Sequence, residues 1–258
     1  MNIVVLVKEV PDTYEDRKLS LETGLADRGA TAAVLDEISE RSLEVALAYA
    51  DAHESTNVTV LSVAPEGTSA TLRKCLAMGA ASAVHVVDDG LLGADLTLTA
   101  EVLAEALRRV SFDLVIAGNL STDGAGGMVP AAIAELLGVA HMTGLSTVDI
   151  SADAVSGTRP VDGGVQTVSA QLPSVISITE ALPDARFANF KGIMAAKKKP
   201  LETVSLADLG VDPETPGVAR SIMLTVAEKP LRTAGIKIVD EGDAAEQLAS
   251  FLVENRLV

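Results

Sequence analysis

The residues best suited to hold a ligand form one loop. The segment 118–127 carries four glycines and the hydroxyls of Ser121 and Thr122, and it lies between an aliphatic run and a helical pattern. Backbone N–H groups at the start of a helix bind phosphate well when no side chain shields them. The pattern therefore predicts a phosphate site. A flexible strand-to-helix turn is the alternative, although the loop is longer than the roughly 2–6 residues usual for such turns.

The chemistry of this loop limits what it can do. It contains no Lys or Arg, so a phosphate would depend on amides and hydroxyls, and Asp123 is expected to cap the turn or to contact a ribose hydroxyl. There is no G-x-G-x-x-G after the first apolar run and no G-x-x-x-x-G-K-[ST] in the chain. The loop is therefore neither a Walker-type NTPase site nor an ordinary dinucleotide site.

No group of residues predicts catalysis or metal binding. A hydrolytic site needs a nucleophile, a base and an orienting group. His85 lies within an expected strand, His53 ends an expected helix, and His141 is expected in a connecting loop. The single cysteine, Cys75, lies on an apolar helix face and is expected to pack rather than react. We therefore predict no catalytic residue and no metal site.

A second unusual segment is basic. Residues 186–199 hold five basic residues and no acidic one, whereas the rest of the chain has 15 basic and 36 acidic residues, a net charge of −21. The same segment holds two of the four phenylalanines, Phe187 and Phe190, together with Ile193 and Met194. A solvated charged face is the ordinary interpretation. The apolar residues beside the charges favour a docking site for acidic partners.

The elements that must position these segments follow from the apolar pattern. Aliphatic runs typical of doubly covered strands alternate with helical patterns. The runs are 3–7, 58–63, 83–87 and 114–117, and the helical patterns centre on 43–50, 72–76, 96–110 and 129–137. This alternation predicts an α/β fold with a doubly wound, mostly parallel sheet. Ligands of such sheets bind beyond the C-terminal strand ends, where the loop 118–127 would lie.

The pattern changes after residue 140. Short strands are expected at 147–150, 154–160, 166–172 and 175–178, with an antiparallel hairpin turning at Asp162-Gly163-Gly164. After about Glu180 periodicity is lost, apart from an expected helix at about 243–255. Disorder and a tail lying on another subunit are the alternatives, and spaced apolar residues favour the tail. We expect a nucleotide-binding α/β domain at 1–180, a partner recognition loop at 181–200 and a C-terminal arm at 201–258.

Composition narrows the functional class. The chain has 258 residues, a net charge of −16 and 2% aromatic residues. Such an acidic, aromatic-poor chain is ill suited to nucleic acid, which needs basic and stacking side chains. The N-terminus lacks the pattern of a signal peptide, and no apolar run approaches the ~20 residues of a membrane span. One cysteine suits a reducing compartment. We expect a cytoplasmic protein without membrane insertion.

Five ordered segments resemble the β subunit of electron transfer flavoproteins. They are Val7–Asp12, Leu76–Ala80, Leu114–Gly118 with Asp123-Gly124, Ile193–Lys199, and Arg232–Lys237. The segment Ile193–Lys199 is close to the family's recognition-loop signature and is the most specific match. Three departures stand out: Asp36-Glu37 replaces a common Asn-Pro pair, Ile38 replaces an aromatic residue found in some relatives, and Phe190 replaces a common leucine anchor.

The resemblance implies a fold similar to the adenine-nucleotide α-hydrolases, without catalysis, and a set of ligands and partners. This subunit would bury a structural AMP, and FAD would be held mainly by an α subunit in a heterodimer. The AMP site would comprise Leu6, Asp36, Glu37, Ile38, Ser39, Val63, Gly118, Asn119, Leu120, Ser121, Thr122, Asp123, Gly124, Ala125, Gly126, Gly127, Met128 and Val129.

The resemblance also implies a route for electrons. FAD would accept them from acyl-CoA dehydrogenases, as in fatty acid β-oxidation, and from other flavin dehydrogenases, and would pass them to a membrane quinone oxidoreductase. Partner contacts would come from Phe187, Phe190, Lys191, Ile193, Met194, Lys197, Lys198 and Lys199. Two alternatives stay open: an electron-bifurcating β subunit with a second FAD in place of AMP, and a stand-alone adenine-nucleotide-binding protein or nucleotide hydrolase.

Overall fold

The computed structural model describes residues 1–215, 218, 220–232 and 234–258. These residues divide into two compact units, Met1–Leu224 and Thr225–Val258. The first unit contains the cavity and the basic segment described below, and the second contains one helix, α7 (Ala244–Glu254). Thr233, which belongs to the segment Arg232–Lys237, lies outside the described residues.

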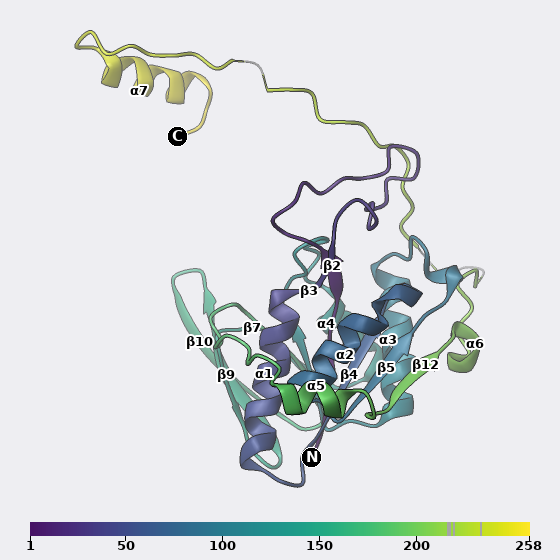
Figure 1. Ribbon diagram of the computed structural model, residues 1–258. Helices are drawn as coiled ribbons and strands as arrows, with labels where there is room; N and C mark the ends of the chain where they lie inside the picture. Colours follow the sequence, from purple (N-terminus) through teal and green to yellow (C-terminus); the bar gives the residue numbers. More distant parts are fainter. Residues whose placement is uncertain (216–217, 219, 233) are drawn as a thin grey trace. The chain divides into compact units, whose positions relative to one another are not determined.

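A parallel sheet of seven strands forms the centre of the first unit (Figure 1). In spatial order the strands are β12 (Leu201–Val204), β5 (Ser82–Val86), β4 (Asn57–Val63), β1 (Asn2–Leu6), β6 (Leu114–Gly118), β11 (Ser174–Ile178) and β7 (Ala140–Leu145). The central strands are almost fully buried, as their continuous aliphatic runs predict. The predicted doubly wound α/β fold is confirmed.

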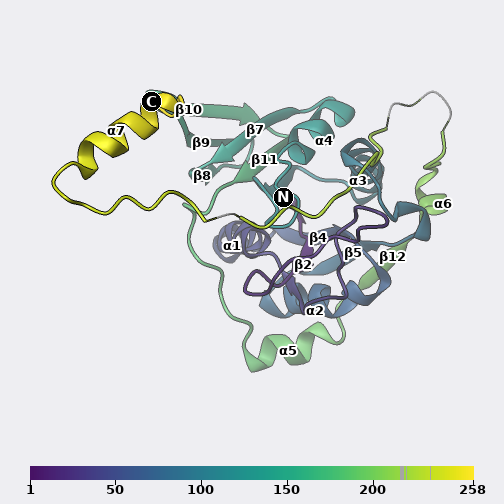
Figure 2. The same ribbon diagram turned by 90° about the horizontal axis from the view of Figure 1, so that it is seen from above.

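Four helices cover the two faces of this sheet (Figure 2). On one face α1 (Glu37–Ala52) and α2 (Ser69–Met78) pack through residues such as Leu43 and Leu76. On the other face α3 (Leu96–Val110) and α4 (Val129–Leu137) pack through residues such as Leu107 and Ile133. The carboxylate of Asp95 caps α3 by accepting a hydrogen bond from the Leu98 N–H at 2.8 Å.

Smaller elements complete the first unit. β8 (Thr147–Ile150), β9 (Ala154–Val161) and β10 (Gly164–Gln171) form an antiparallel sheet, and β9 and β10 make the predicted hairpin. β2 (Glu9–Pro11) pairs with β3 (Ala33–Leu35). The remaining pieces are the short helices α5 (Phe190–Ala196) and α6 (Leu206–Leu209) and the 3₁₀ turns η1 (Glu66–Thr68) and η2 (Asp89–Leu91).

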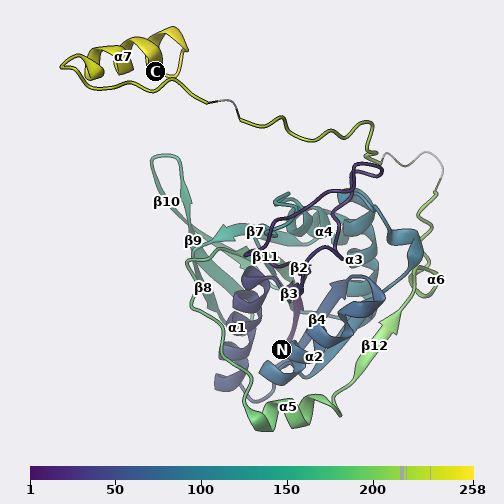
Figure 3. The same cartoon turned by 45° about the horizontal axis from the view of Figure 1, so that its top comes forward.

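Two expectations about the second half of the chain are wrong. His141 lies in β7 rather than in a connecting loop, because β7 pairs with the expected strand 175–178, here β11, at the edge of the central sheet. The irregular region expected after Glu180 instead contains α5, β12 and α6 (Figure 3). β12 extends the sheet by pairing with β5. β7 and β12 contain polar residues and no continuous aliphatic run, so their own sequences give little indication of a strand. Tertiary pairing decides their structure.

Candidate functional site

A cavity of about 380 Å³ lies beyond the C-terminal ends of β1, β4 and β6. β4 and β5 lie on one side of β1, and β6 lies on its other side. The cavity therefore lies where the strand order reverses. Ligands of doubly wound sheets bind at this kind of position. Its wall contains the apolar side chains of Leu6, Leu61, Val63, Leu103 and Val129. A flat apolar ring could pack against such a wall.

The polar half of the wall contains a buried carboxylate with one free oxygen. Asp36, at the N-terminal end of α1, is 1% exposed, and its Oδ2 accepts a hydrogen bond from the Thr122 N–H at 2.9 Å. Its Oδ1 has no partner within the described residues. Burial raises the pKa of Asp36 above its usual range, the negative Asp123 adds to the rise, and N–H donors from Thr122 and Ile38 oppose it. A ligand hydroxyl or amine donated to Oδ1 would relieve an unsatisfied polar group.

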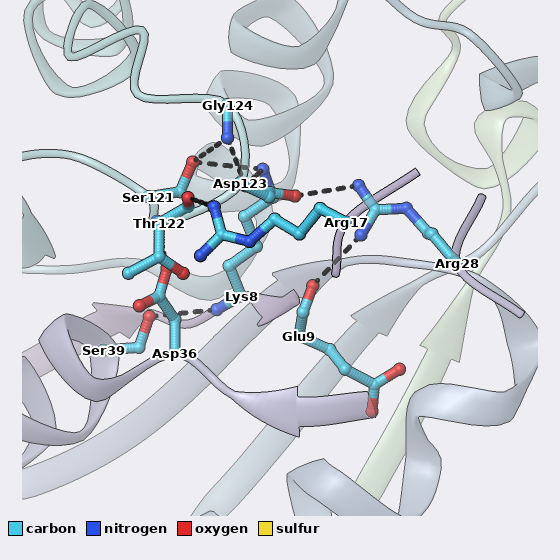
Figure 4. A network of polar contacts seen from close by, with 10 residues as sticks. All are labelled: Lys8, Glu9, Arg17, Arg28, Asp36, Ser39, Ser121, Thr122, Asp123 and Gly124. Atoms are coloured by element: carbon cyan, nitrogen blue, oxygen red, sulfur yellow. Dashed lines mark hydrogen bonds and ion pairs between the residues drawn. The ribbon is translucent and has the colours of Figure 1, made fainter. Parts of the chain in front are cut away.

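Asp123, in the glycine-rich loop, is held by cations from the N-terminal segment (Figure 4). Its carboxylate accepts from Lys8 Nζ at 2.7 Å and from Arg28 Nη2 at 3.1 Å. Burial would raise the pKa of Asp123, but the Lys8 ammonium, the Ser121 hydroxyl and the Gly124 N–H outweigh it and hold that pKa at about 2. The charge of Asp123 is thus balanced by the two cations, which weakens its repulsion of a nearby phosphate.

The segment between β2 and β3 also ties down this loop. Arg17 of this segment donates from its guanidinium to the carbonyl oxygen of Thr122, and Lys8, which precedes β2, donates from Nζ to the hydroxyl of Ser121 at 3.2 Å. The sequence showed no basic residue inside the loop, so it missed these contacts. One signal was present for Lys8: it directly follows the first strand, at the edge of the sheet where ligands bind.

Most of the predicted site residues meet around the cavity. Those that line it are Leu6, Asp36, Ile38, Ser39, Val63, Gly118, Asn119, Leu120, Ser121, Gly124, Gly126, Gly127 and Val129. Glu37, Thr122, Asp123, Ala125 and Met128 lie outside the lining. Sequence reasoning missed the contribution of the start of α3, where Asp95, Leu96 and Thr99 form part of the wall. The sequence pattern marked Asp95 as the start of this helix and Leu96 as part of its apolar face, but it did not show that either residue lines the cavity.

The basic segment forms a second candidate site. Phe187 is 97% exposed and Phe190, the first residue of α5, is 79% exposed. Ile193 and Met194 are about half exposed, and with Phe190 they follow the i, i+3, i+4 spacing of one helix face. Lys191, Lys197 and Lys198 are also exposed. An apolar face with basic neighbours is therefore present at the surface of the first unit.

Both ends of this segment are anchored to the main fold. Before it, Arg186 donates to Glu44 of α1 from Nε and from Nη2, each at 2.8 Å, and pairs with Asp51 at 2.8 Å. Burial would raise the pKa of Glu44, but the hydrogen bonds and charge of Arg186 outweigh it and lower that pKa. After α5, Lys199 Nζ donates to backbone carbonyls at the end of α2. Lys199 is therefore engaged within the fold.

The cysteine and two of the histidines, residue types that can act in catalysis, are held by contacts within the fold. Cys75 is fully buried, and burial raises the pKa of its thiol to about 12, as its predicted packing role requires. His85 is buried in β5 with Nε2 3.0 Å from the Ala64 carbonyl oxygen, and His53 stacks on Tyr49. No group of three or more His, Cys, Asp or Glu residues in the described ranges could hold a metal ion. None of the described helices is long and apolar enough to cross a membrane.

The second unit exposes apolar side chains. No residue of α7 is buried, and Leu248 and Val253 are 51% and 64% exposed. Leu231, Ile236 and Val239, which precede the helix, are more than two-thirds exposed. Apolar residues at this density on the surface of a segment are typical of an interface with another chain.

Comparisons with known proteins agree on one family. The family model described as "Electron transfer flavoprotein domain" matches residues 23–209. The electron transfer flavoprotein subunit beta of Mycobacterium leprae (strain TN) is 46% identical over 264 residues, covering 100% of this chain and 99% of the relative. That of Bacillus subtilis (strain 168) is 32% identical over 256 residues, covering 98% and 97%. The caffeyl-CoA reductase-Etf complex subunit CarD of Acetobacterium woodii is 33% identical over 222 residues, covering 86% and 84%.

Proposed function

Because the chain belongs to the electron transfer flavoprotein family and aligns along its length with beta subunits, we propose that it forms the β half of a cytoplasmic electron carrier. An α subunit holds most of the FAD. The flavin takes electrons from acyl-CoA and other flavin dehydrogenases and delivers them to a membrane quinone oxidoreductase. The redox chemistry belongs to the flavin, so this chain contributes binding, orientation and docking.

The cavity would hold an AMP that stabilises the subunit. The observation that carries this proposal is Oδ1 of Asp36, a buried carboxylate oxygen without a partner in the described residues, on the wall of an otherwise largely apolar cavity. It would accept a hydrogen bond from a ribose hydroxyl or from the amino group of adenine. Backbone N–H groups at 126–129, where α4 begins, would face the phosphate.

The second unit would bind the α subunit. Its exposed apolar residues would otherwise remain in water, at a cost of roughly 25 cal/mol for each Å² of apolar surface. In the first unit, Tyr14 is 92% exposed and is the aromatic residue of the N-terminal segment that a flavin could contact. Ile38 lines the cavity instead.

The exposed face of α5 would dock the dehydrogenases. Phe190 supplies a large apolar anchor, and the flanking lysines supply positive charge that attracts an acidic partner surface. Docking at this place brings a donor protein to the heterodimer without any covalent step by this chain. Electrons would then pass between the two flavins.

Counting the bound cofactors of the heterodimer tests this proposal. The chain would be co-expressed with an electron transfer flavoprotein α subunit, purified, denatured and analysed for released nucleotides. We expect a yellow heterodimer with one FAD and one AMP. Two FAD and no AMP would support the bifurcating alternative. A chain that stays alone, carries no flavin and hydrolyses ATP would contradict the proposal.

A further inference from the structure

The C-terminal ends of helices α2 and α5 are each bound by a basic side chain that comes from the other helix or from the residues just after it. Arg73 of α2 donates from Nη1 to the carbonyl oxygens of Ala196 and Lys199, both at 2.7 Å. Lys199, just after α5, donates from Nζ to the carbonyl oxygens of Leu76, Gly79 and Ala80 at 2.9, 3.3 and 2.6 Å. The last carbonyls of a helix have no partner within the helix, and a cation there also complements the helix dipole.

A close backbone contact fixes the same pair of helices. A Cβ atom added at Gly192 would lie 2.2 Å from the Ala77 carbonyl oxygen, so α5 approaches the end of α2 more closely than any other residue would allow. Ala196, four residues later and on the same side of α5, is 3% exposed. The small residues thus face α2, while Phe190, Ile193 and Met194 face away from it.

We propose that Arg73 and Lys199 are positioning residues that hold α5 in its docking orientation, so that Lys199 acts through the fold rather than as a charge for the partner. This inference rests on the proposed docking function. Lys199 and Arg73 form no ion pair with a carboxylate among the described residues, and burial lowers the pKa of Lys199. A helix of seven residues has little stability of its own, so its order depends on these contacts.

Preorganisation explains why the two cations matter for docking. If α5 were loose, a partner would have to order it on binding, and that cost would weaken the complex. The neighbouring Lys198 differs because its side chain is exposed, and Lys197 is exposed as well. Those two lysines can attract an acidic partner at long range, in a manner that salt screens.

The test compares Lys199→Met with Lys198→Met in the purified heterodimer. An acyl-CoA dehydrogenase reduced by its acyl-CoA serves as the electron donor. We expect Lys199→Met to raise KM for the dehydrogenase roughly tenfold with kcat unchanged, and by the same factor at low and high salt. Lys199→Arg, which can still donate to carbonyls, should restore most of the loss. Lys198→Met should raise KM about twofold at low salt only.

Hydrogen exchange of the amides in 190–199 gives a readout without any donor protein. Faster exchange in Lys199→Met than in wild type and Lys198→Met supports the proposal. The proposal is overturned if Lys199→Met keeps the hydrogen exchange and the KM of the wild type. It is also overturned if the KM of Lys199→Met rises only at low salt, as expected for Lys198→Met. If Lys199→Met yields no soluble heterodimer, Arg73→Gln decides by the same exchange measurement. A wild-type heterodimer with protected α5 amides that no dehydrogenase reduces would instead reject the docking function.

Discussion

The loop beside the cavity and the helix α5 are both fixed by cations that bond to groups distant in the sequence, but the acceptors differ. At the cavity, Lys8 and Arg28 pair with the carboxylate of Asp123. At α5, Arg73 and Lys199 donate to backbone carbonyls. A carboxylate can be protonated and its ion pairs are screened by salt, whereas a carbonyl does not titrate. The two sites should therefore respond differently to pH, salt and substitution.

Phe190→Ala should show the largest effect, and it should be confined to docking. The side chain is exposed, so its loss leaves no cavity in the fold. If Phe190 fills a partner pocket, truncation should cost about 2 kcal/mol, which is about a 30-fold rise in KM for a reduced dehydrogenase. AMP content and the midpoint of thermal unfolding should not change. A loss of AMP or of the α subunit would place Phe190 within the fold instead.

Gly192→Ala should weaken docking by displacing α5. The added methyl would meet the Ala77 carbonyl oxygen, which belongs to the backbone of α2 and cannot move aside easily. We expect a rise of roughly tenfold in KM and a loss of 1–2 kcal/mol in the free energy of unfolding of the heterodimer. Gly164→Ala is the matched control, because a Cβ there meets nothing within 4 Å. Equal behaviour of the two variants would contradict the close packing.

Asp123→Asn should act at the cavity and spare docking. It removes the charge that Lys8 and Arg28 share, but both cations are about 40% exposed, so solvent discounts the loss. We expect a decrease of about 1 kcal/mol in the free energy of unfolding and a lower AMP content. Glu40→Gln, which breaks the more exposed pair with Lys74, should cost a few tenths of a kcal/mol.

The pH dependence of this effect has a definite sign. The folded-state pKa of Asp123, about 2, is below the value of about 4 in an unfolded chain. Its stabilisation is therefore present above pH 4 and is lost as the pH falls from about 4 to about 2. The stability difference between wild type and Asp123→Asn, measured by denaturant unfolding, should shrink over this range. A constant difference would contradict the ion pairs.

Asp36→Asn should have the smallest effect on stability, with the opposite sign. Burial raises the folded-state pKa of Asp36, so the ionised carboxylate costs stability above that pKa, and the cost disappears as the pH falls below about 4. The substitution should raise the free energy of unfolding of the nucleotide-free heterodimer at pH 7 by less than about 1 kcal/mol. The exposed Asp149 supplies the control Asp149→Asn, which should leave stability unchanged.

The sequence predicted the elements that carry long apolar patterns and missed those that depend on partners. The runs of β1, β4, β5 and β6 and the face of α3 were sufficient because each element buries a continuous apolar surface. β12 has four residues, half of them polar or exposed, and it forms because β5 offers an open edge. A local pattern cannot show that edge.

The candidate site divides in the same way. Glycines and hydroxyls between a strand and a helix were sufficient to place the loop 118–127 beside a cavity. The cations that fix it come from about 95–115 residues away, as the pairs of Asp123 with Arg28 and Lys8 show. Likewise the sequence grouped Lys199 with Lys197 and Lys198, whereas the structure places its ammonium on the end of α2. Sequence adjacency therefore grouped lysines that differ in structural role.

The central claim is that this chain is half of an electron carrier that flavin dehydrogenases reduce. The most direct measurement follows the flavin absorbance of the wild-type heterodimer after mixing with an acyl-CoA dehydrogenase and its acyl-CoA. We expect rapid bleaching that requires all three components and whose rate saturates with dehydrogenase concentration. A flavin that stays oxidised with each acyl-CoA and other flavin dehydrogenase tested would contradict the account.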